Sequence, residues 1–265
     1  MTEQTMTNPA ANYYTTQYTE ETRLFKDNAH RVEYLTTIRY FDKLFTPGSS
    51  VLDACAGAGA YAFYLAQNGY NVTAGDLVPH HVNIMQQHPS AAKLADIIEC
   101  NVLDLSMFAD ASFDVVLCMG ALYHLYTPEE QQQAIAECTR VCKPGGLVLL
   151  AYIPLLGAVF ARLDETASNT NTIFDHMNDP AREVFVCNNP CEIDDFAKAA
   201  GLEKLHEIST DGPIYYTGAK LNDATPEDFQ AYMDFHYVIC ESPGVISASL
   251  HGLWIGKKHD NTTTD

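Results

Sequence analysis

Basic residues are scarce in this chain, and their scarcity limits the partners that it can bind. The 265 residues include 15 Lys and Arg against 34 Asp and Glu, a formal net charge of −19 at pH 7. Proteins bind nucleic acids and anionic membrane surfaces mainly through positive patches. The composition therefore predicts neither partner. An acidic balance is typical of a well-solvated surface, and selection for cationic or neutral substrates is the alternative.

Paired cysteine motifs are also missing. Eight cysteines occur without any CxxC pair, and neither Cys138 with Cys142 nor Cys187 with Cys191 makes a complete zinc site. The first residues are polar and lack the basic, apolar leader of secreted proteins, in which disulfides are common. We expect free, mostly buried thiols, no metal site and a cytoplasmic protein.

Long apolar runs are few. One uncharged run, residues 144–161, reaches 18 residues, which is the length at which a membrane-spanning helix becomes possible. A Pro-Gly-Gly turn opens this run and Pro154 interrupts it. The run therefore predicts a buried strand, a loop and an apolar helix.

The most informative stretch is residues 51–76, which is predicted to form a strand, a glycine turn, a helix and a second strand. Asp53 ends the first strand, and Gly57 and Gly59 let the backbone turn tightly and approach a ligand closely. Asp76 ends the second strand, about 20 residues past the turn, where a carboxylate suits the two hydroxyls of a ribose. The stretch therefore predicts a cofactor that contains a nucleoside.

Two cofactors are compatible with this stretch. The spacing of Gly57, Gly59 and Ala62 fits the looser dinucleotide fingerprint. A pyrophosphate at a helix N-terminus, however, would be repelled by the carboxylate of Asp53. S-adenosylmethionine has no phosphate and carries an ammonium and a sulfonium, so an acid near the turn favours it. A nicotinamide-dependent oxidoreductase and a non-catalytic S-adenosylmethionine-binding protein are the alternatives.

The acidic and glycine positions resemble the first motif of the class I S-adenosylmethionine-dependent methyltransferases. In that family an acidic residue precedes a glycine-rich turn, and a second acid ends the next strand. Asp53, Gly57, Gly59 and Asp76 match this pattern, whereas Cys55 stands where many members have glycine.

Later segments resemble the same family. Residues 113–119 open with Phe-Asp and continue as an apolar strand, and residues 143–146 are the Lys-Pro-Gly-Gly turn. Residues 120–125 resemble a bacterial subgroup that has Gly-Pro-Leu-Tyr-His-Leu after its fourth strand, with Ala121 in the proline position. The resemblance extends over residues 13–258.

The resemblance implies an α/β fold. Its centre is a Rossmann-like, seven-stranded, mostly parallel sheet with an antiparallel strand 7, helices on both faces and a helical lid. The predicted organisation is an N-terminal helical cover (1–45), a cofactor-binding core (46–153), an insertion or lid (154–188), the remaining part of the sheet (189–258) with an inserted cover helix (209–249), and a tail (259–265).

The resemblance also implies which residues contact S-adenosylmethionine. Arg23 in the N-terminal cover is expected to pair with the methionine carboxylate, and Asn101 is expected to bond the adenine edge. The complete predicted set is Arg23, Asp53, Ala54, Gly57, Gly59, Asp76, Leu77, Asn101, Val102, Met119 and Gly120.

His124 and Tyr123 are the candidate catalytic residues, because the loop after the fourth strand is expected to face the transferred methyl group. An imidazole titrates near neutral pH and can accept a proton. The alternative for His124 is a histidine that only fixes the loop by hydrogen bonds. Tyr123 is either a wall of the pocket or a core aromatic residue.

The acceptor is predicted to be a small molecule. Tyr14 is a candidate contact from the N-terminal cover, and Tyr215 and Tyr216 are candidates from a loop before the second cover helix. His236 lies in that helix and is either a pocket residue or an interface residue. The acceptor atom (O, N, S or C) and the oligomeric state stay open.

Overall fold

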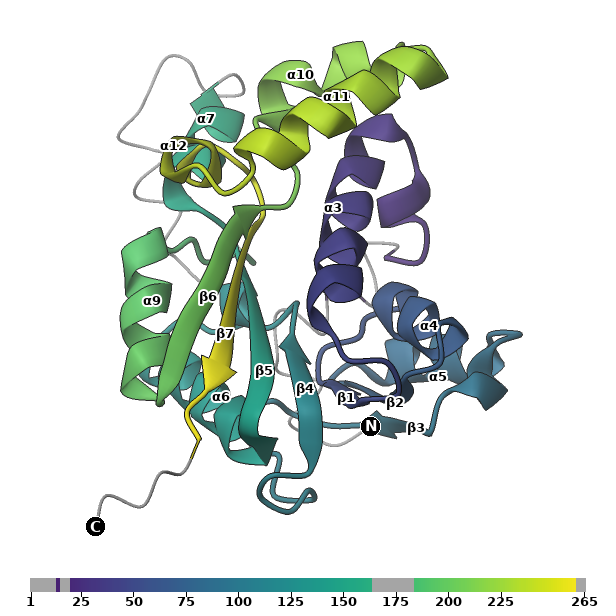
Figure 1. Cartoon of the computed structure of the whole chain (residues 1–265), viewed down its shortest axis with the longest axis vertical. Coiled ribbons are helices and arrows are strands. Elements are labelled where there is room, and N and C mark those ends of the chain that lie inside the picture. Colours follow the sequence, from purple (N-terminus) through teal and green to yellow (C-terminus); the bar gives the residue numbers. More distant parts are fainter. Residues whose placement is uncertain (1–12, 15–19, 164–183, 261–265) are drawn as a thin grey trace.

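A seven-stranded mixed sheet forms the centre of the molecule (Figure 1). The computed structural model describes residues 13–14, 20–163 and 184–260. The strands are β1 (Ser50–Asp53), β2 (Asn71–Asp76), β3 (Asp96–Glu99), β4 (Phe113–Cys118), β5 (Cys142–Tyr152), β6 (Leu202–Ser209) and β7 (Gly252–Lys258).

The strand order is β3-β2-β1-β4-β5-β7-β6, and β7 runs antiparallel to both β5 and β6. The neighbouring pairs from β3 to β5 are parallel. This topology confirms the predicted Rossmann-like sheet with an antiparallel seventh strand. It also places the carboxyl ends of β1, β2 and β4 at one edge, where ligands bind in open α/β sheets.

Helices cover both faces of the sheet, as predicted. They are α3 (Asn28–Leu44), α4 (Ala60–Gln67), α5 (Pro79–Gln87), α6 (Pro128–Val141), α7 (Leu155–Leu163), α9 (Pro190–Ala199), α10 (Ile214–Asn222), α11 (Pro226–Ile239) and α12 (Pro243–Ser247), with 3-10 turns η1 (Arg23–Phe25), η2 (Ala91–Lys93) and η3 (Leu122–His124).

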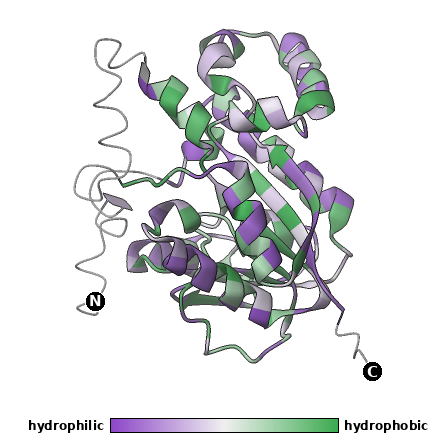
Figure 2. Ribbon diagram, turned by 90° about the vertical axis from the view of Figure 1, so that its left-hand side faces the viewer, coloured by the Kyte–Doolittle hydropathy of each residue, from purple (hydrophilic) through white to green (hydrophobic). Residues whose placement is uncertain are grey.

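Alternate strand residues point to opposite faces of the sheet and divide the core into two clusters. Leu52 and Val116 pack in one cluster with α6 and α9, whereas Val51 and Val115 pack in the other with α3 and α4. In Figure 2 hydrophobic residues run along the strands, and many outer helix positions are hydrophilic. The buried sheet therefore provides a rigid base for the loops at its carboxyl edge.

Three helices form a cover above this edge. A smaller apolar cluster joins α3, α10 and α11 through Val32, Leu221, Phe229 and Met233. Figure 1 shows α10 and α11 lying across the upper end of α3. The N-terminal and second cover segments thus pack together, although they are far apart in the sequence.

The predicted N-terminal helical cover (1–45) is not one continuous helix in the part that the structure describes. The long helix α3 begins only at Asn28, because Asp27 is extended and its carboxylate accepts a hydrogen bond from the backbone N–H of His30 at 3.0 Å. Before this N-cap, the chain forms only the short turn η1. The break lets Arg23 approach the sheet edge separately from α3.

The prediction that Tyr215 and Tyr216 lie in a loop is wrong, because both residues are part of the helix α10. This helix begins after Pro213, which has no side-chain cap, so the usual start signal is missing. The third strand is also shorter than its apolar run predicts: β3 ends at Glu99, and Asn101 lies in the loop beyond it.

Among the described residues, no helix has the length and apolarity needed to cross a membrane. The run 144–161 instead forms most of β5 and part of α7, as its turn and proline predict. Residues 164–183 of the predicted insertion and 261–265 of the predicted tail lie outside the described residues.

Candidate active site

A cavity lies at the carboxyl edge of the sheet, where the loops after β1, β2, β3 and β4 meet. Leu24 of η1 and Tyr14 border it from the N-terminal side. Most residues predicted from the sequence to contact a ligand line this cavity. They are Tyr14, Arg23, Asp53, Ala54, Gly57, Asp76, Leu77, Asn101, Val102, Met119, Gly120, Tyr123 and His124.

Four predicted residues do not line this cavity. Gly59 lies behind the loop at the start of α4. Tyr216 is exposed on α10 and contacts Phe160 of α7 edge to face, with 5.9 Å between ring centroids, and Tyr215 precedes it in the same helix. His236 is fully buried inside the cover, where its ring stacks over Tyr232.

The glycine turn brings backbone close to the cavity. Gly57 has φ of +55°, and its N–H donates to the Asp76 carboxylate at 2.8 Å. Gly59 has φ of +88°, and a β-carbon there would lie 2.7 Å from the Phe63 ring. Both positions suit glycine, the first beside the cavity and the second for helix packing.

Two buried carboxylates lie on the same side of the cavity. Asp53 and Asp76 are 2% and 8% exposed. The backbone N–H of Val78 donates to Asp76 at 2.8 Å, and His81 Nδ1 lies 3.2 Å from the same oxygen. Burial, with a contribution from the negative charge of Asp76, raises the pKa of Asp53 to about 7. An added cation would relieve this cost of ionising Asp53.

This arrangement fits S-adenosylmethionine better than a dinucleotide. A pyrophosphate would add negative charge beside Asp53, whose ionisation burial and the charge of Asp76 already disfavour. An ammonium or sulfonium would instead find a buried carboxylate within the same cavity. The residues present therefore suit the positively charged cofactor.

His124 is neutral and has a defined tautomer. Burial lowers its pKa to about 4. Its Nδ1–H donates to the carbonyl oxygen of Val184 at 3.0 Å, because that oxygen can only accept. Nε2 therefore carries the lone pair, and the Tyr14 hydroxyl donates to it at 3.2 Å. The imidazole presents a proton acceptor inside the cavity.

Tyr123 belongs to an aromatic wall beside His124. Burial raises the pKa of Tyr123 well above the usual value for a phenol, so it stays protonated. Its ring lies 6.0 Å from Phe185, which also contacts His124 at 5.1 Å and Tyr13 at 5.7 Å between centroids. Phe185 had no motif in its neighbourhood and could not be identified from the sequence.

Arg23 lines the cavity but is already paired within the protein. It donates from both terminal nitrogens to the two carboxylate oxygens of Glu33, at 2.6 and 2.9 Å, and from Nε to Glu20 at 2.9 Å. Burial alone raises the pKa of Glu33, but Arg23 and His251 lower it to about 2. The cover helix α3 is therefore joined to the cavity by a buried ion pair.

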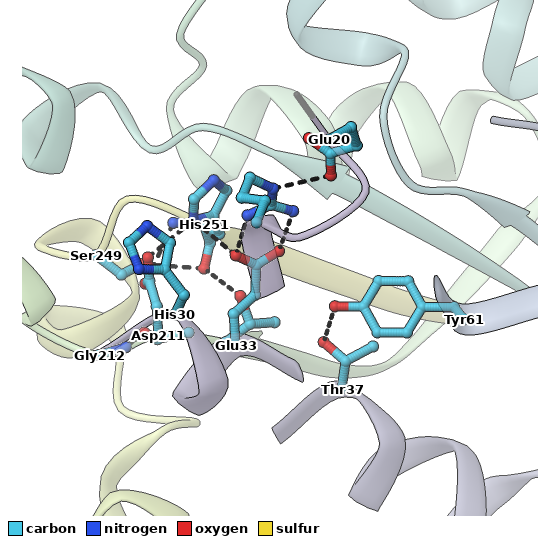
Figure 3. A network of polar contacts seen from close by, with 12 residues as sticks. Glu20, His30, Glu33, Thr37, Tyr61, Asp211, Gly212, Ser249 and His251 are labelled. Atoms are coloured by element: carbon cyan, nitrogen blue, oxygen red, sulfur yellow. Dashed lines mark hydrogen bonds and ion pairs between the residues drawn. The ribbon is translucent and has the colours of Figure 1, made fainter. Parts of the chain in front are cut away.

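Asp211 and His251 extend this network and were not identified from the sequence (Figure 3). His251 Nδ1 lies 2.8 Å from Asp211 Oδ2 and 3.5 Å from Glu33 Oε2. They meet because Ser209 of β6 pairs with Gly252 of β7. Predicting the antiparallel pairing of β6 with β7 would have placed Asp211 and His251 together at the ligand-binding edge.

No group of three or more His, Cys, Asp or Glu side chains arranged for a metal ion occurs within residues 13–14, 20–163 and 184–260. None of the eight cysteines, all of which lie within the described residues, forms a disulfide.

Comparison with known proteins places the core in a family. Residues 52–150 match the family described as "Methyltransferase domain". The chain is 29% identical over 209 residues to a ubiquinone biosynthesis O-methyltransferase of Xanthomonas euvesicatoria pv. vesicatoria, covering 77% of this chain and 82% of that protein. A namesake from Xanthomonas oryzae pv. oryzae is 33% identical over 135 residues, which is 51% of this chain and 53% of the relative.

The fold has similar solved structures. The PH0226 protein from Pyrococcus horikoshii superposes with a TM-score of 0.63 at 18% identity, covering 93% of this chain and 98% of that one. Three observations indicate the same kind of protein: the match to the methyltransferase domain, the strand order of the sheet, and the buried acids beside the glycine turn. These findings identify residues 52–150 as a methyltransferase domain and support an S-adenosylmethionine-dependent methyltransferase with the class I fold.

Proposed function

We propose that this methyltransferase transfers its methyl group to a hydroxyl oxygen of a small molecule and that His124 accepts the hydroxyl proton. The observation that carries the proposal is the Nε2 lone pair of neutral His124, which already accepts a hydrogen bond from the phenol of Tyr14 inside the cavity. An acceptor hydroxyl that replaces or joins Tyr14 would be bound in the same way.

In this reaction the protein has two main tasks, which are to orient the acceptor toward the methyl group and to remove the hydroxyl proton. Bound S-adenosylmethionine supplies an electrophilic methyl group on a sulfonium. Tyr123 and Phe185 hold the acceptor against the loop after β4. His124 takes the hydroxyl proton as the O–CH3 bond forms, so the oxygen becomes a stronger nucleophile and no positive charge remains on the methylated oxygen. Because the imidazole is neutral at physiological pH, it is ready to accept.

The cofactor contacts in this proposal follow the lining of the cavity. Asp53, Ala54 and the Gly57 backbone would hold the charged methionine end. Asp76, which now accepts a hydrogen bond from the Gly57 N–H, would bind the ribose hydroxyls. Leu77, Asn101 and Val102 would hold the adenine, and Met119 and Gly120 would lie near the sulfonium. Arg23 would contact the methionine carboxylate while its guanidinium stays paired with Glu20 and Glu33.

The two Xanthomonas relatives support oxygen as the acceptor atom, since both are named as O-methyltransferases. The predicted domain boundaries, a cytoplasmic location and the lack of a nucleic-acid partner stay predictions. The net charge of −19 supports the last of these.

The test measures S-adenosylhomocysteine release with matched panels of phenols, catechols and primary amines. We expect turnover with hydroxylated compounds and a loss of roughly 10²- to 10⁴-fold in kcat for His124→Gln. His80→Gln, an exposed histidine on α5, is the control and should keep full activity. Turnover of amines alone, or an unchanged kcat in His124→Gln, would contradict the proposal.

A further inference from the structure

A second chamber adjoins the cofactor cavity on the side of α7 and the start of β7. Tyr14, Glu20, Arg23 and Tyr123 line both spaces, so the two are neighbours across these side chains. The second chamber lies beyond the place where His124 and Tyr14 meet. The part of an acceptor that is not methylated would occupy it.

One wall of the second chamber is aromatic. The Tyr13 and Phe185 rings meet edge to face at 5.7 Å, and Tyr123 lies 6.0 Å from Phe185. Ile153 and Ala158 continue the apolar lining from the end of β5 and from α7. A flat ring fits such a wall through offset or edge contacts.

His251 also lines the second chamber, and its orientation is fixed by neighbouring carboxylates. Its Nδ1 is held by Asp211 at 2.8 Å and lies 3.5 Å from Glu33. Figure 3 shows these groups gathered around the His251 ring. The two ring nitrogens of an imidazole diverge, so Nε2 points away from Asp211. His251 lines the second chamber, whereas Asp211 and Glu33 are not in its lining.

The carboxylates behind His251 favour its charged form. Burial lowers the pKa of His251, but the nearby charges of Glu33 and Asp211 outweigh burial and raise the pKa above the ordinary value. Protonated His251 offers an Nε2–H to the chamber while Nδ1–H donates to Asp211. The ring is therefore a pre-oriented, charged donor.

The lining of the second chamber is basic in a strongly acidic protein. Its described side chains include Arg23, His30, Arg162 and His251 but one carboxylate, that of Glu20. Net charge across the chain suggested cationic or neutral substrates, yet the local lining has the opposite sign. The carboxylates of Glu33 and Asp211 stabilise this lining from behind.

We infer that the acceptor is a hydroxylated aromatic acid: its ring packs on Tyr13, Tyr123 and Phe185, and its carboxylate binds His251. The inference rests on the proposed function, because it takes the acceptor hydroxyl to lie at His124. His251 and Asp211 then select the acceptor and leave methyl transfer itself to the first cavity. Asp211 is a positioning residue, since it acts through His251.

The test compares two ligands that differ only in the acid. Binding of 4-hydroxybenzoate and of 4-hydroxybenzyl alcohol is measured by calorimetry with the protein saturated in S-adenosylhomocysteine, so no turnover is required. We expect the acid to bind roughly 10- to 100-fold more tightly. In His251→Gln this preference should fall to within about twofold, with affinity for S-adenosylhomocysteine unchanged, and His80→Gln should keep it.

A second measurement needs no variant. In the wild-type protein the preference for the acid should decline as pH rises from 6 to 8.5, because His251 loses its proton and its positive charge. The charged and titratable groups that surround His251 are Glu33, Asp211, Arg23 and His30. Equal binding of both ligands, or a preference that His251→Gln and pH leave unchanged, would overturn the inference. If the acid binds selectively but is not methylated, the inference about His251 stands and the proposed methyl transfer to a hydroxyl is overturned.

Discussion

Nε2 of His124 lies 3.2 Å from the hydroxyl oxygen of Tyr14, and the two rings meet edge to face at 5.4 Å. The hydroxyl donates because Nδ1 is committed to the Val184 carbonyl at 3.0 Å. The protein thus positions a phenol against the only lone pair of a neutral imidazole. An acceptor hydroxyl has a pre-formed position beside that nitrogen.

The first prediction concerns the pH dependence of turnover. At saturating cofactor and acceptor, kcat should be independent of pH between 6 and 8, because the pKa of His124 is about 4 and the ring is neutral throughout. Activity should decline only as pH approaches that value. An inflection between pH 6 and 7 that disappears in His124→Gln would contradict this account.

The second prediction concerns cofactor affinity. Asp53 has a pKa of about 7 in the free protein, and a bound cation favours the carboxylate. Affinity for S-adenosylmethionine should rise with pH up to about 7 and level off above it, with a proton released on binding below that pH. Calorimetry in two buffers of different ionisation enthalpy measures the release. Asp53→Asn should bind more weakly and with no pH dependence; a pH-dependent Asp53→Asn would point to another group.

The third prediction concerns stability without cofactor. Because the folded pKa of Asp53 exceeds the unfolded value near 3.9, ionisation of Asp53 destabilises the fold increasingly from about pH 4 to 7. Asp53→Asn should therefore raise the free energy of unfolding, with a gain that is larger at pH 8 than at pH 5.5 by roughly 1–2 kcal/mol. Urea denaturation at the two pH values tests this. If Asp53→Asn raises the free energy of unfolding equally at the two pH values, the effect comes from packing and not from ionisation.

The fourth prediction concerns the buried pair of Arg23 and Glu33. Glu33→Gln should cost about 3–5 kcal/mol, because the largely buried Arg23 would lose its bidentate partner and keep only Glu20. Arg23→Gln should cost a similar amount, and the double variant less than the sum, as measured by a urea-denaturation cycle. Lys26→Gln, exposed in the same segment, should change stability by less than about 0.5 kcal/mol.

The pH dependence of this pair has the opposite sign to that of Asp53. The pKa of Glu33 is lowered to about 2, so its stabilising contribution is complete above the unfolded value near 4.3 and is lost as pH falls toward 2. Additive effects in the cycle would show that the two side chains do not stabilise each other.

The fifth prediction separates backbone strain from crowding. Gly59→Ala adds a β-carbon 2.7 Å from Phe63 at φ of +88°, whereas Gly48→Ala has similar φ of +81° and nothing within 4 Å. Both substitutions should cost about 1 kcal/mol for the left-handed backbone, and Gly59→Ala roughly 1–3 kcal/mol more for overpacking. Equal losses in thermal or urea unfolding would mean that α4 shifts to make room.

Local signals made the cofactor half of the chain predictable. The turn after β1, the acid that ends β2 and the capping box of α6, in which Thr127 and Glu130 bond each other's backbone, are all encoded within a few residues. Such patterns depend on short-range hydrogen bonds and on the conformational freedom of glycine. The sheet order followed from the family that these motifs resemble.

The acceptor side depends on contacts between distant residues and was less predictable. Tyr14 and His124 are 110 positions apart, and Asp211 and His251 are 40 apart. The periodicity of a sequence does not indicate which distant residues form such pairs. In addition, α10 has no side-chain cap to mark its start. Tyr215, Tyr216 and His236 were predicted from their place in or just before the second cover helix, and the structure places them outside the first cavity.

The insertion of β7 between β5 and β6 has a consequence for biosynthesis. Because β7 is the last strand along the chain, β5 keeps an open edge and β6 lacks its neighbour until residues 252–258 have been synthesised. On the ribosome, the sheet therefore stays incomplete after β5 and β6 have emerged, until residues 252–258 follow them. Chaperones that shield exposed strand edges would find their substrate in that interval.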